Sequence, residues 1–319
     1  MAEPDILMPA PMPPDVIAAL DGRCVLHRLW EQPDREAFLA AIGPRIRGMA
    51  VSTLAGRIDD ALFDRLPALE IVASFGVGYD TVDAAGAARR GIMVTNTPGV
   101  LDEEVADLTL GLLLATIRQI PQAERHVREG RWPAGPFALS PTLRGRRIGI
   151  LGLGAIGKAV ARRLEGFGVP IAYHGRTRQP DVGYAYHASP AALAAACDVL
   201  IAIVPGGAGT RQLVDAAVLA ALGPDGVVIN VSRGSGVDEA ALIAALQSGT
   251  ILAAGLDVFA DEPQVPAALL ALPNVVALPH IGSASVATRA AMGALVVDNL
   301  FAWFGTGQAI TPVAETAPY

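Results

Sequence analysis

Three side chains in the second half of the 319-residue sequence have the chemistry to reduce a carbonyl group: Arg233, Glu262 and His280. An arginine binds a carboxylate through two parallel charge-assisted hydrogen bonds and can also lean toward an adjacent carbonyl. A histidine can donate a proton to the oxygen of that carbonyl, and a nearby glutamate favours the charged imidazole and holds its orientation. Together the three predict a 2-oxoacid reductase, provided that a hydride donor binds beside them.

Each of these side chains also has a plainer interpretation when it is considered alone. Arg233 could cap a helix or pair with Asp238, and Glu262 precedes Pro263 and could be an ordinary turn residue. An isolated histidine is more often bonded to the backbone than catalytic. What favours catalysis is the combination of all three with a dinucleotide-binding loop.

A glycine-rich segment earlier in the chain predicts that loop. In "IGILGLGAIGKAVARRL", three glycines have the G-x-G-x-x-G spacing between an apolar strand and a helical pattern. The first glycine permits a tight turn, the second lets the backbone approach a pyrophosphate, and the third lets the helix pack on the strand. The amino end of the helix supplies N–H donors to the phosphates. The predicted cofactor contacts of the loop are Gly152, Leu153, Gly154, Ala155, Ile156 and Gly157.

The end of the following strand indicates which dinucleotide binds. An NAD site would place an acid there to bind the ribose, but the strand runs into "YHGRTRQP", with Arg176 and Thr177. A cation suits a 2′-phosphate, which a carboxylate would repel. We therefore expect NADPH to be preferred, without excluding NADH. The alternative is that Arg176 is a solvated surface residue, since arginine carries nearly all positive charge in a chain whose only lysine is Lys158.

Short apolar strands position the remaining polar residues. Arg233 follows "GVVINVS", Asp257 follows "AAGL" and His280 follows "NVVALP". In an open parallel sheet the carboxyl ends of the strands line one crevice, so these residues should converge where the nicotinamide lies. The cofactor contacts expected after the strands are Val204, Pro205, Val231, Ser232, Arg233, Asp257, His280 and Gly282.

An alternation of strands and helices occurs twice, and a helical segment at 101–120, apolar nearly all round, predicts a helix buried between two domains. We expect an α/β fold with two Rossmann-like parallel-sheet domains, one flavodoxin-like and one dinucleotide-binding, and an active-site cleft between them. Residues 1–99 and 286–319 form the predicted substrate-binding domain, because the tail "QAITPV" resembles a segment returning to the first domain. Residues 100–285 form the predicted NAD(P)-binding domain, with a dimerisation arm at 118–146.

Composition narrows the class of protein. Hydrophobic residues make up 52% of the chain and charged residues 17%, which is typical of a well-buried globular protein. A net charge of −7 argues against nucleic acid as a partner, and no apolar stretch is long enough to span a bilayer. Cys24 and Cys197 match no metal spacing and predict free thiols in a reducing compartment. Since no signal peptide is visible, we expect a cytoplasmic protein without a metal or membrane partner.

The stretch from "FGVGYDTVD" to "PHIGSAS" closely resembles the D-isomer-specific 2-hydroxyacid dehydrogenases, and the similarity covers nearly the whole chain. Its markers are "GLGAIGKAVARRL", "VINVSRGSGVDEAAL", "AAGLDVFADEP" and "LPNVVALPHIGSAS". The separations of Arg233, Glu262 and His280 agree with the catalytic residues of that family. "YHGRTRQP" and "YAYHAS" look most like its glyoxylate/hydroxypyruvate and hydroxyphenylpyruvate reductase branch. The loop "VPGGAGTRQLV" departs from the family, which usually has a "PLTPET"-like sequence there.

The resemblance implies further roles. Asp257 would hold the nicotinamide carboxamide, and backbone amides near Val77 and Gly78 would bind the substrate carboxylate. In the family, a tryptophan at the place of Trp132 often comes from the partner subunit and covers the pocket. Leu54, after a strand of the first domain, is expected to face the substrate, although it could simply lie in a connection. The predicted substrate-binding residues are Val77, Gly78, Leu54, Arg233, His280 and Trp132.

An arm as apolar as 118–146 would be exposed on a monomer, so we expect a homodimer. The leading hypothesis is an NADPH-preferring reductase of glyoxylate, hydroxypyruvate and bulkier 2-oxoacids such as phenylpyruvates. One alternative is a 3-phosphoglycerate dehydrogenase, which needs a phosphate-binding cation in the first domain, where Arg57 is the nearest candidate. Another is a non-catalytic co-repressor that senses nucleotides with the same fold.

Overall fold

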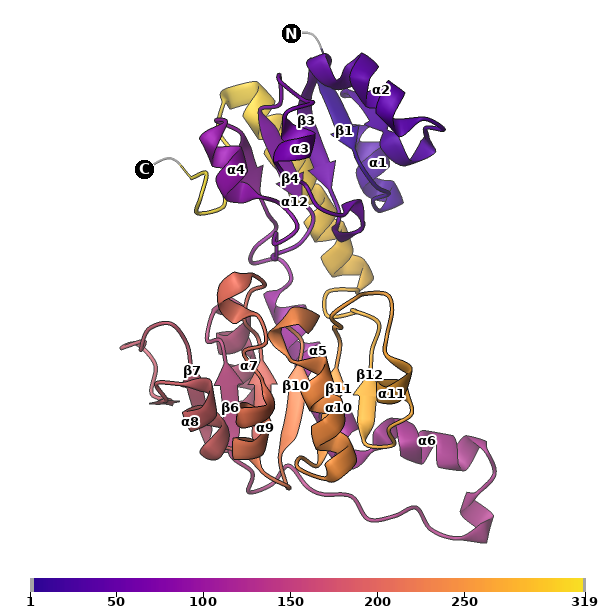
Figure 1. Cartoon of the computed structure of the whole chain (residues 1–319), viewed down its shortest axis with the longest axis vertical. Coiled ribbons are helices and arrows are strands. Elements are labelled where there is room, and N and C mark those ends of the chain that lie inside the picture. Colours follow the sequence, from indigo (N-terminus) through magenta and orange to yellow (C-terminus); the bar gives the residue numbers. More distant parts are fainter. Residues whose placement is uncertain (1–2, 318–319) are drawn as a thin grey trace. The chain divides into compact units, whose positions relative to one another are not determined.

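A computed structural model describes residues 3–317 (Figure 1). By its internal contacts the chain separates into two compact units. Residues 3–101 and 285–317 form unit 1, and residues 102–284 form unit 2. Each unit is built on one sheet whose strands all pair in parallel. The predicted α/β class with two parallel-sheet domains is thereby confirmed.

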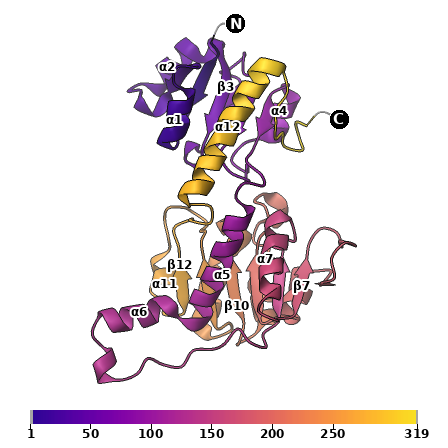
Figure 2. The same cartoon turned by 180° about the vertical axis from the view of Figure 1, so that it is seen from behind.

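Unit 1 contains five strands in the order β2-β1-β3-β4-β5, which is the flavodoxin-like order. The strands are β1 (Asp5–Met8), β2 (Val25–Arg28), β3 (Ile46–Val51), β4 (Ile71–Ser74) and β5 (Met93–Thr95). The helices are α1 (Pro14–Leu20), α2 (Arg35–Ile42), α3 (Asp60–Phe63), α4 (Ala84–Arg89) and α12 (Val286–Thr306). Helices α1 and α12 pack together on one face (Figure 2). Buried residues of α2, α3 and α4 form one core with the other face.

The C-terminal segment pairs with the sheet of unit 1. Thr95 bridges Pro312 in antiparallel direction, and the N–H of Val313 donates to the Val94 carbonyl at 2.9 Å. The hydroxyl of Thr316 donates to the same carbonyl at 3.1 Å. Residues more than 200 positions apart in sequence are therefore joined by main-chain hydrogen bonds.

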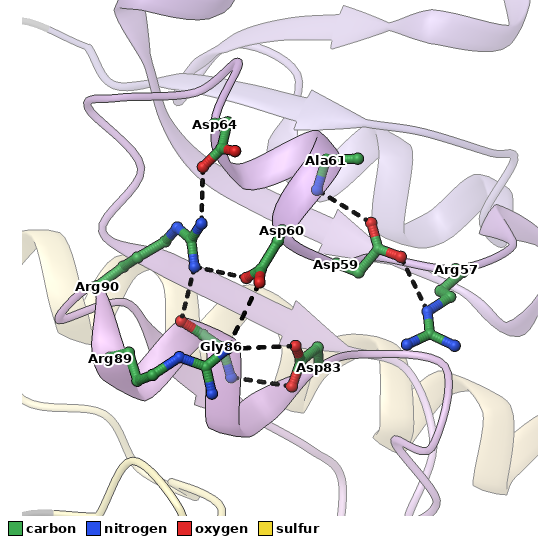
Figure 3. A network of polar contacts seen from close by, with 9 residues as sticks. All are labelled: Arg57, Asp59, Asp60, Ala61, Asp64, Asp83, Gly86, Arg89 and Arg90. Carbon is green, nitrogen blue, oxygen red and sulfur yellow. Dashed lines mark hydrogen bonds and ion pairs between the residues drawn. The ribbon is translucent and has the colours of Figure 1, made fainter.

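An ion-pair network joins the short helices α3 and α4 of unit 1 (Figure 3). The guanidinium of Arg90, at the end of α4, donates to Asp60 at 2.5 Å and to Asp64 at 2.6 Å. Arg89 lies 3.5 Å from Asp60 and 3.8 Å from Asp83. Helices of four and six residues are marginal alone, so the packing beneath them is the main support of α3 and α4, and these exposed ion pairs add little.

Unit 2 contains seven strands in the order β12-β11-β10-β9-β6-β7-β8, a Rossmann order with one added edge strand. The strands are β6 (Ile148–Leu151), β7 (Ile171–His174), β8 (Ala185–Tyr186), β9 (Val199–Ala202), β10 (Val227–Asn230), β11 (Ala253–Leu256) and β12 (Val275–Ala277). The helices are α5 (Asp102–Arg118), α6 (Ile120–Arg128), α7 (Ala155–Glu165), α8 (Pro190–Ala195), α9 (Ala216–Leu222), α10 (Glu239–Ser248) and α11 (Ala267–Leu270).

Both faces of this sheet are covered by helices, so its central strands are buried throughout. Along β10, Val227 and Ile229 join the core beneath α5 and α7, whereas Val228 joins the core beneath α8, α9 and α10. This alternation is the period of two expected for a strand. Figure 1 shows α8, α9 and α10 in front of the sheet, and Figure 2 shows α5 and α7 in front of it.

Helix α5 is amphipathic within unit 2, so the expectation of an all-round apolar helix is wrong. Its buried residues pack on β10, β11 and α7, while Glu103, Asp107 and Gly111 form an exposed stripe four residues apart. Glu103 pairs with Arg162 and Arg163 of α7 at 2.6 and 2.7 Å. Among residues 3–317, no helix has both the length and the apolar character needed to cross a membrane.

Candidate active site

The shortest contact between the predicted catalytic residues joins Glu262 and His280. Glu262 lies in the loop after β11, and His280 lies three residues after β12 ends at Ala277. Nδ1 of His280 lies 2.6 Å from Oε2 of Glu262, and each side chain keeps about a third of its surface exposed (37% and 33%). Because Nδ1 is engaged by the carboxylate, Nε2 is the ring nitrogen that can present a proton to a ligand.

The loops around Glu262 determine its charge state. Burial by itself raises the pKa of Glu262, but hydrogen bonds from His280 and from the N–H of Phe259, at 3.0 Å, lower it. The positive charge of Arg233 lowers it further, and the resulting pKa lies below the ordinary glutamate value. Glu262 is therefore a carboxylate at neutral pH, with one oxygen on the imidazole and the other on the backbone.

Asp257 organises the turn that carries His280. It is 1% exposed, directly after β11, and its two oxygens accept hydrogen bonds from the N–H groups of Ile281 and Gly282, both at 2.8 Å. The N–H of His280 donates to the Asp257 carbonyl at 2.9 Å. These bonds hold His280 at φ +53°, in the left-handed region that few non-glycine residues adopt. Burial raises the pKa of Asp257, and the two amide hydrogen bonds offset part of that effect.

Arg233 is placed by a small polar scaffold at the end of β10. Asn230, 1% exposed, accepts hydrogen bonds from the hydroxyl of Ser232 at 2.7 Å and from its N–H at 3.1 Å. The side-chain amide of Asn230 donates to the Arg233 carbonyl at 3.2 Å. The guanidinium of Arg233 donates to the Ser232 carbonyl at 2.9 Å.

The backbones of the Arg233 and Glu262 loops lie in direct contact. A Cβ placed on Gly234 would lie 1.8 Å from the carbonyl carbon of Phe259, so only glycine fits there. Because Phe259 also donates to Glu262, this contact fixes the loop of the arginine against the loop of the glutamate. The structure thus brings Arg233, Glu262 and His280 together at the carboxyl ends of β10, β11 and β12.

The glycine-rich loop between β6 and α7 has the geometry of a pyrophosphate cradle. Gly152 has φ +103°, and a Cβ there would lie 2.4 Å from the Ile203 carbonyl oxygen. A Cβ on Gly157 would lie 2.2 Å from the Gly152 carbonyl oxygen, whereas one on Gly154 would meet nothing within 4 Å. Gly152 and Gly157 therefore permit tight packing, whereas Gly154 leaves open space at the amino end of α7, where a phosphate could lie.

The segment after β7 carries the cations predicted to select the cofactor. Arg176, Thr177 and Arg178 are exposed, and neither arginine forms an ion pair with any residue in the described part of the chain. His174, just before them, stacks on Tyr186 with ring centroids 6.3 Å apart, and its Nδ1 lies 2.8 Å from the His187 carbonyl oxygen. The arginines thus remain available to an anion.

The loop "VPGGAGTRQLV" follows β9 and docks on the loop of Arg233. The hydroxyl of Thr210 donates to the Pro205 carbonyl at 2.6 Å, and the N–H of Gln212 donates to the Ser235 carbonyl at 2.7 Å. Gly207 has φ +134°, which explains a glycine at this position. Val204 and Pro205, at the start of this loop, stay predicted cofactor contacts, as do Val231 and Gly282.

Other predicted substrate contacts lie in different parts of the chain. Val77 and Gly78 follow β4 in unit 1, where the carbonyl of Val77 accepts a hydrogen bond from the Asn96 side chain at 2.8 Å. Leu54 is 74% exposed in unit 1, and Trp132 is 64% exposed in the arm of unit 2. Their contacts with substrate stay predictions.

Sequence reasoning missed the supporting residues of this site. Asn230 is a polar residue that closes an otherwise apolar strand, and this break in the pattern could have singled it out. The amide contacts of Asp257 had no such signal, since they depend on the left-handed turn at His280. Within residues 3–317, no group of three or more histidine, cysteine, aspartate or glutamate side chains is arranged to hold a metal ion.

Comparison with known proteins places this site in a family. The model of the D-isomer specific 2-hydroxyacid dehydrogenase NAD-binding domain matches residues 110–282. The hydroxyphenylpyruvate reductase of Plectranthus scutellarioides is 46% identical over 308 residues, which cover 97% of this chain and 98% of that protein. The glyoxylate/hydroxypyruvate reductase A HPR2 of Arabidopsis thaliana has the same identity and coverage.

A solved structure is also similar over nearly the whole chain. It is the NADPH-dependent glyoxylate/hydroxypyruvate reductase of Sinorhizobium meliloti in complex with NADP and malonate, with 57% sequence identity and a TM-score of 0.94. The match covers 99% of this chain and 98% of that one.

Proposed function

The chain belongs to the D-isomer specific 2-hydroxyacid dehydrogenases, and on this premise we propose that it is an NADPH-preferring reductase of glyoxylate, hydroxypyruvate and related 2-oxoacids. The observation that carries the proposal is the hydrogen-bonded pair of Glu262 and His280, with the charge of Arg233 acting on it. In this proposal unit 2 binds the cofactor and unit 1 contributes to substrate binding.

The residues of the site divide the reaction between them. Arg233 holds the substrate carboxylate and polarises the adjacent carbonyl. Nε2 of His280 donates a proton to the carbonyl oxygen, and Glu262 stabilises the protonated imidazole and orients it. The bound cofactor supplies the hydride that reduces the carbonyl carbon. Asp257 keeps the His280 turn in place.

Several features of the chain fit NADPH. The glycine-rich loop has open space at Gly154 for the pyrophosphate. Arg176 and Thr177 provide a cation and a hydroxyl for the 2′-phosphate, at a strand end that lacks the acid an NAD site uses. The relative from Sinorhizobium meliloti is described as NADPH-dependent and was solved with NADP.

Replacing Arg176 with alanine tests this assignment. Because a charge-assisted hydrogen bond contributes about 1.5–3 kcal/mol, we expect the Kd of NADPH to rise about tenfold to a hundredfold and the Kd of NADH to change little. The Kd values are measured by fluorescence titration of both reduced cofactors. An equal loss of affinity for both would remove the 2′-phosphate role from Arg176.

The substrate class is tested by a spectrophotometric panel. NADPH and NADH are each combined with glyoxylate, hydroxypyruvate, phenylpyruvate, 4-hydroxyphenylpyruvate and 2-oxobutyrate, and oxidation of the cofactor is followed. We expect turnover of glyoxylate and hydroxypyruvate with NADPH. No turnover of any 2-oxoacid would overturn the proposed activity.

The alternative of a 3-phosphoglycerate dehydrogenase depends on Arg57 as the nearest cation of unit 1. Its guanidinium donates to Asp59 at 2.8 Å within the same loop (Figure 3), so a phosphate there would lie beside a carboxylate of like charge. A non-catalytic co-repressor would not need the contact between Glu262 and His280, so that contact favours an enzyme.

We also propose that the protein is a homodimer formed through its arm. Exposed apolar residues cluster there: Ile120 and Val127 on α6, Trp132, and Leu139, which is fully exposed. Ile120, Ala123 and Val127 line a hollow with Leu114 of α5. A second copy of the chain could cover this apolar surface.

A cytoplasmic location is proposed from the two cysteines. Cys24 and Cys197 are free and buried, and burial raises the pKa of their thiols to about 11 and about 12. Unreactive free thiols are typical of a reducing compartment.

A further inference from the structure

We propose that Gln179 is a positioning residue for NADPH selectivity, because its side chain fixes the segment of Arg176, Thr177 and Arg178 against the glycine-rich loop. This inference rests on the proposed function and deepens it. The 2′-phosphate and the pyrophosphate belong to one ligand, so the two loops that bind them must keep a set distance. Gln179 bridges those loops.

The bridge is a direct hydrogen bond. Nε2 of Gln179 donates to the carbonyl oxygen of Leu153 at 2.7 Å. Leu153 lies between Gly152 and Gly154 and is 3% exposed, so the acceptor is part of the pyrophosphate loop itself. Gln179 is half-buried and directly follows the exposed cations.

The main chain of Gln179 is held by a second, buried group. Its N–H donates to the hydroxyl oxygen of Tyr173 at 2.7 Å. Tyr173 belongs to β7, is fully buried, and packs against Tyr186 with ring centroids 5.4 Å apart. A rigid strand residue thus anchors one side of Gln179, and the glycine-rich loop anchors the other.

The segment that carries Arg176, Thr177 and Arg178 has few other contacts. At its start, the hydroxyl of Tyr186 donates to the Gly175 carbonyl at 3.4 Å. Asp181, which follows this segment, forms an exposed ion pair with Lys158 at 3.0 Å, and such a pair contributes little to stability. Without the Gln179 bridge, binding of the 2′-phosphate would have to order the segment, which lowers affinity.

The glycine-rich loop does not depend on Gln179 to the same degree. The N–H of Gly152 donates to the His174 carbonyl at 2.9 Å, and the loop packs closely on Ile203 and on Gly157. NADH has no 2′-phosphate, so its affinity depends on this loop rather than on the arginines. Loss of the hydrogen bond between Gln179 and Leu153 should therefore weaken the binding of NADPH more than the binding of NADH.

The test compares Gln179→Met with Gln122→Met in the full-length protein. Methionine keeps the length of the side chain and removes the N–H donor. Gln122 is a matched control, since its Nε2 also donates to a backbone carbonyl of unit 2, that of Pro273 at 3.0 Å. Tyr173→Phe removes the second anchor, and Arg176→Ala serves as reference for the 2′-phosphate contact.

The Kd values of NADPH and NADH are measured by fluorescence titration for each variant. One net hydrogen bond corresponds to about a two- to tenfold change in Kd. We expect Gln179→Met and Tyr173→Phe to raise the Kd of NADPH by that factor, with the Kd of NADH changed less than about twofold. Gln122→Met should change neither Kd.

The outcomes separate this inference from the proposed cofactor preference. If Arg176→Ala raises the Kd of NADPH and Gln179→Met does not, the role of Gln179 is overturned and the NADPH assignment stands. If Gln179→Met raises the Kd values of both cofactors equally, Gln179 supports the glycine-rich loop but does not favour NADPH over NADH. The inference is then also overturned. If the unmodified protein binds both cofactors equally and Arg176→Ala changes neither Kd, both proposals fall.

Discussion

Glu262 is the residue on which the loops of the site converge. One of its oxygens lies on the imidazole of His280, and the other accepts the N–H of Phe259, whose backbone touches Gly234 beside Arg233. A carboxylate in this position keeps the ring of His280 aligned through Nδ1. The proposed proton donor and the proposed carboxylate-binding arginine are thereby linked through one acidic side chain.

The lowered pKa of Glu262 predicts a pH-dependent contribution to stability. Because its pKa in the folded protein lies below the unfolded value, ionised Glu262 stabilises the fold above the ordinary glutamate pKa of about 4.3, and this is lost as the pH falls through the folded pKa. Relative to Glu262→Gln, we expect an advantage of at most about 1 kcal/mol near neutral pH, since the side chain is partly exposed.

Urea unfolding of both proteins at several pH values between about 7 and 3 measures this difference. The gap in free energy of unfolding should narrow on acidification. A gap that stays constant across the range would show that the charge of Glu262 is not what stabilises the folded state.

Residue types and strand ends singled out Arg233, Glu262 and His280 as candidates, because functional side chains in a parallel sheet often follow its strands. Their supports were not predictable in the same way. The φ of +53° at His280 and the amide contacts of Asp257 arise from how two loops fit together. No local pattern in the sequence encodes that fit.

At the scale of elements, glycines set how closely loops and helices approach. Gly157 lies in the first turn of α7 against the Gly152 carbonyl, whereas Gly111 lies in the middle of α5 with nothing near its Cβ position. Close packing therefore explains the glycine at position 157, whereas no contact explains the glycine at position 111.

Alanine at each position should separate the two cases. Gly157→Ala places a Cβ 2.2 Å from a backbone oxygen, so we expect a loss of about 1–3 kcal/mol in unfolding free energy and weaker binding of both cofactors. Gly111→Ala should raise stability by up to about 1 kcal/mol, because alanine favours a helix and meets no obstacle. Urea unfolding compares them, and a Gly157→Ala protein as stable as the unmodified one would refute the close packing.

Helix α5 shows where element-level prediction failed. Its sequence is apolar enough to suggest burial on all sides, yet Glu103, Asp107 and Gly111 form an exposed stripe. Glu103 and Asp107 mark this stripe in the sequence, but at Gly111 no polar side chain continues it. Burial of the rest follows from packing on the sheet of unit 2 and on α7.

At the scale of the whole molecule, the chain leaves unit 1, completes unit 2 and returns. The expectation of this order comes from a last helix with no strand after it and from a tail that resembles a returning segment. The bridge of Thr95 with Pro312 provides that partner. The proposed homodimer would use the exposed apolar residues of the arm.

The proposed dimer predicts that Val127→Asp weakens association. Val127 is 55% exposed on α6, and burying a valine contributes about 1.5–3 kcal/mol, so we expect the dimer Kd to rise at least about tenfold. Leu270→Asp is a matched control, since Leu270 is 60% exposed on α11, outside the arm. Sedimentation velocity over a concentration series measures both. Equal behaviour of the two variants, or a monomeric unmodified protein, would contradict the assignment.

Turnover of hydroxypyruvate by His280→Gln tests the central claim most directly. NADPH oxidation is measured at saturating cofactor and substrate, and the NADPH Kd is measured on the same protein. Removing a positioned proton donor should lower kcat by about 10²–10⁴-fold and leave the Kd nearly unchanged. A His280→Gln protein with the kcat of the unmodified enzyme would contradict the mechanism.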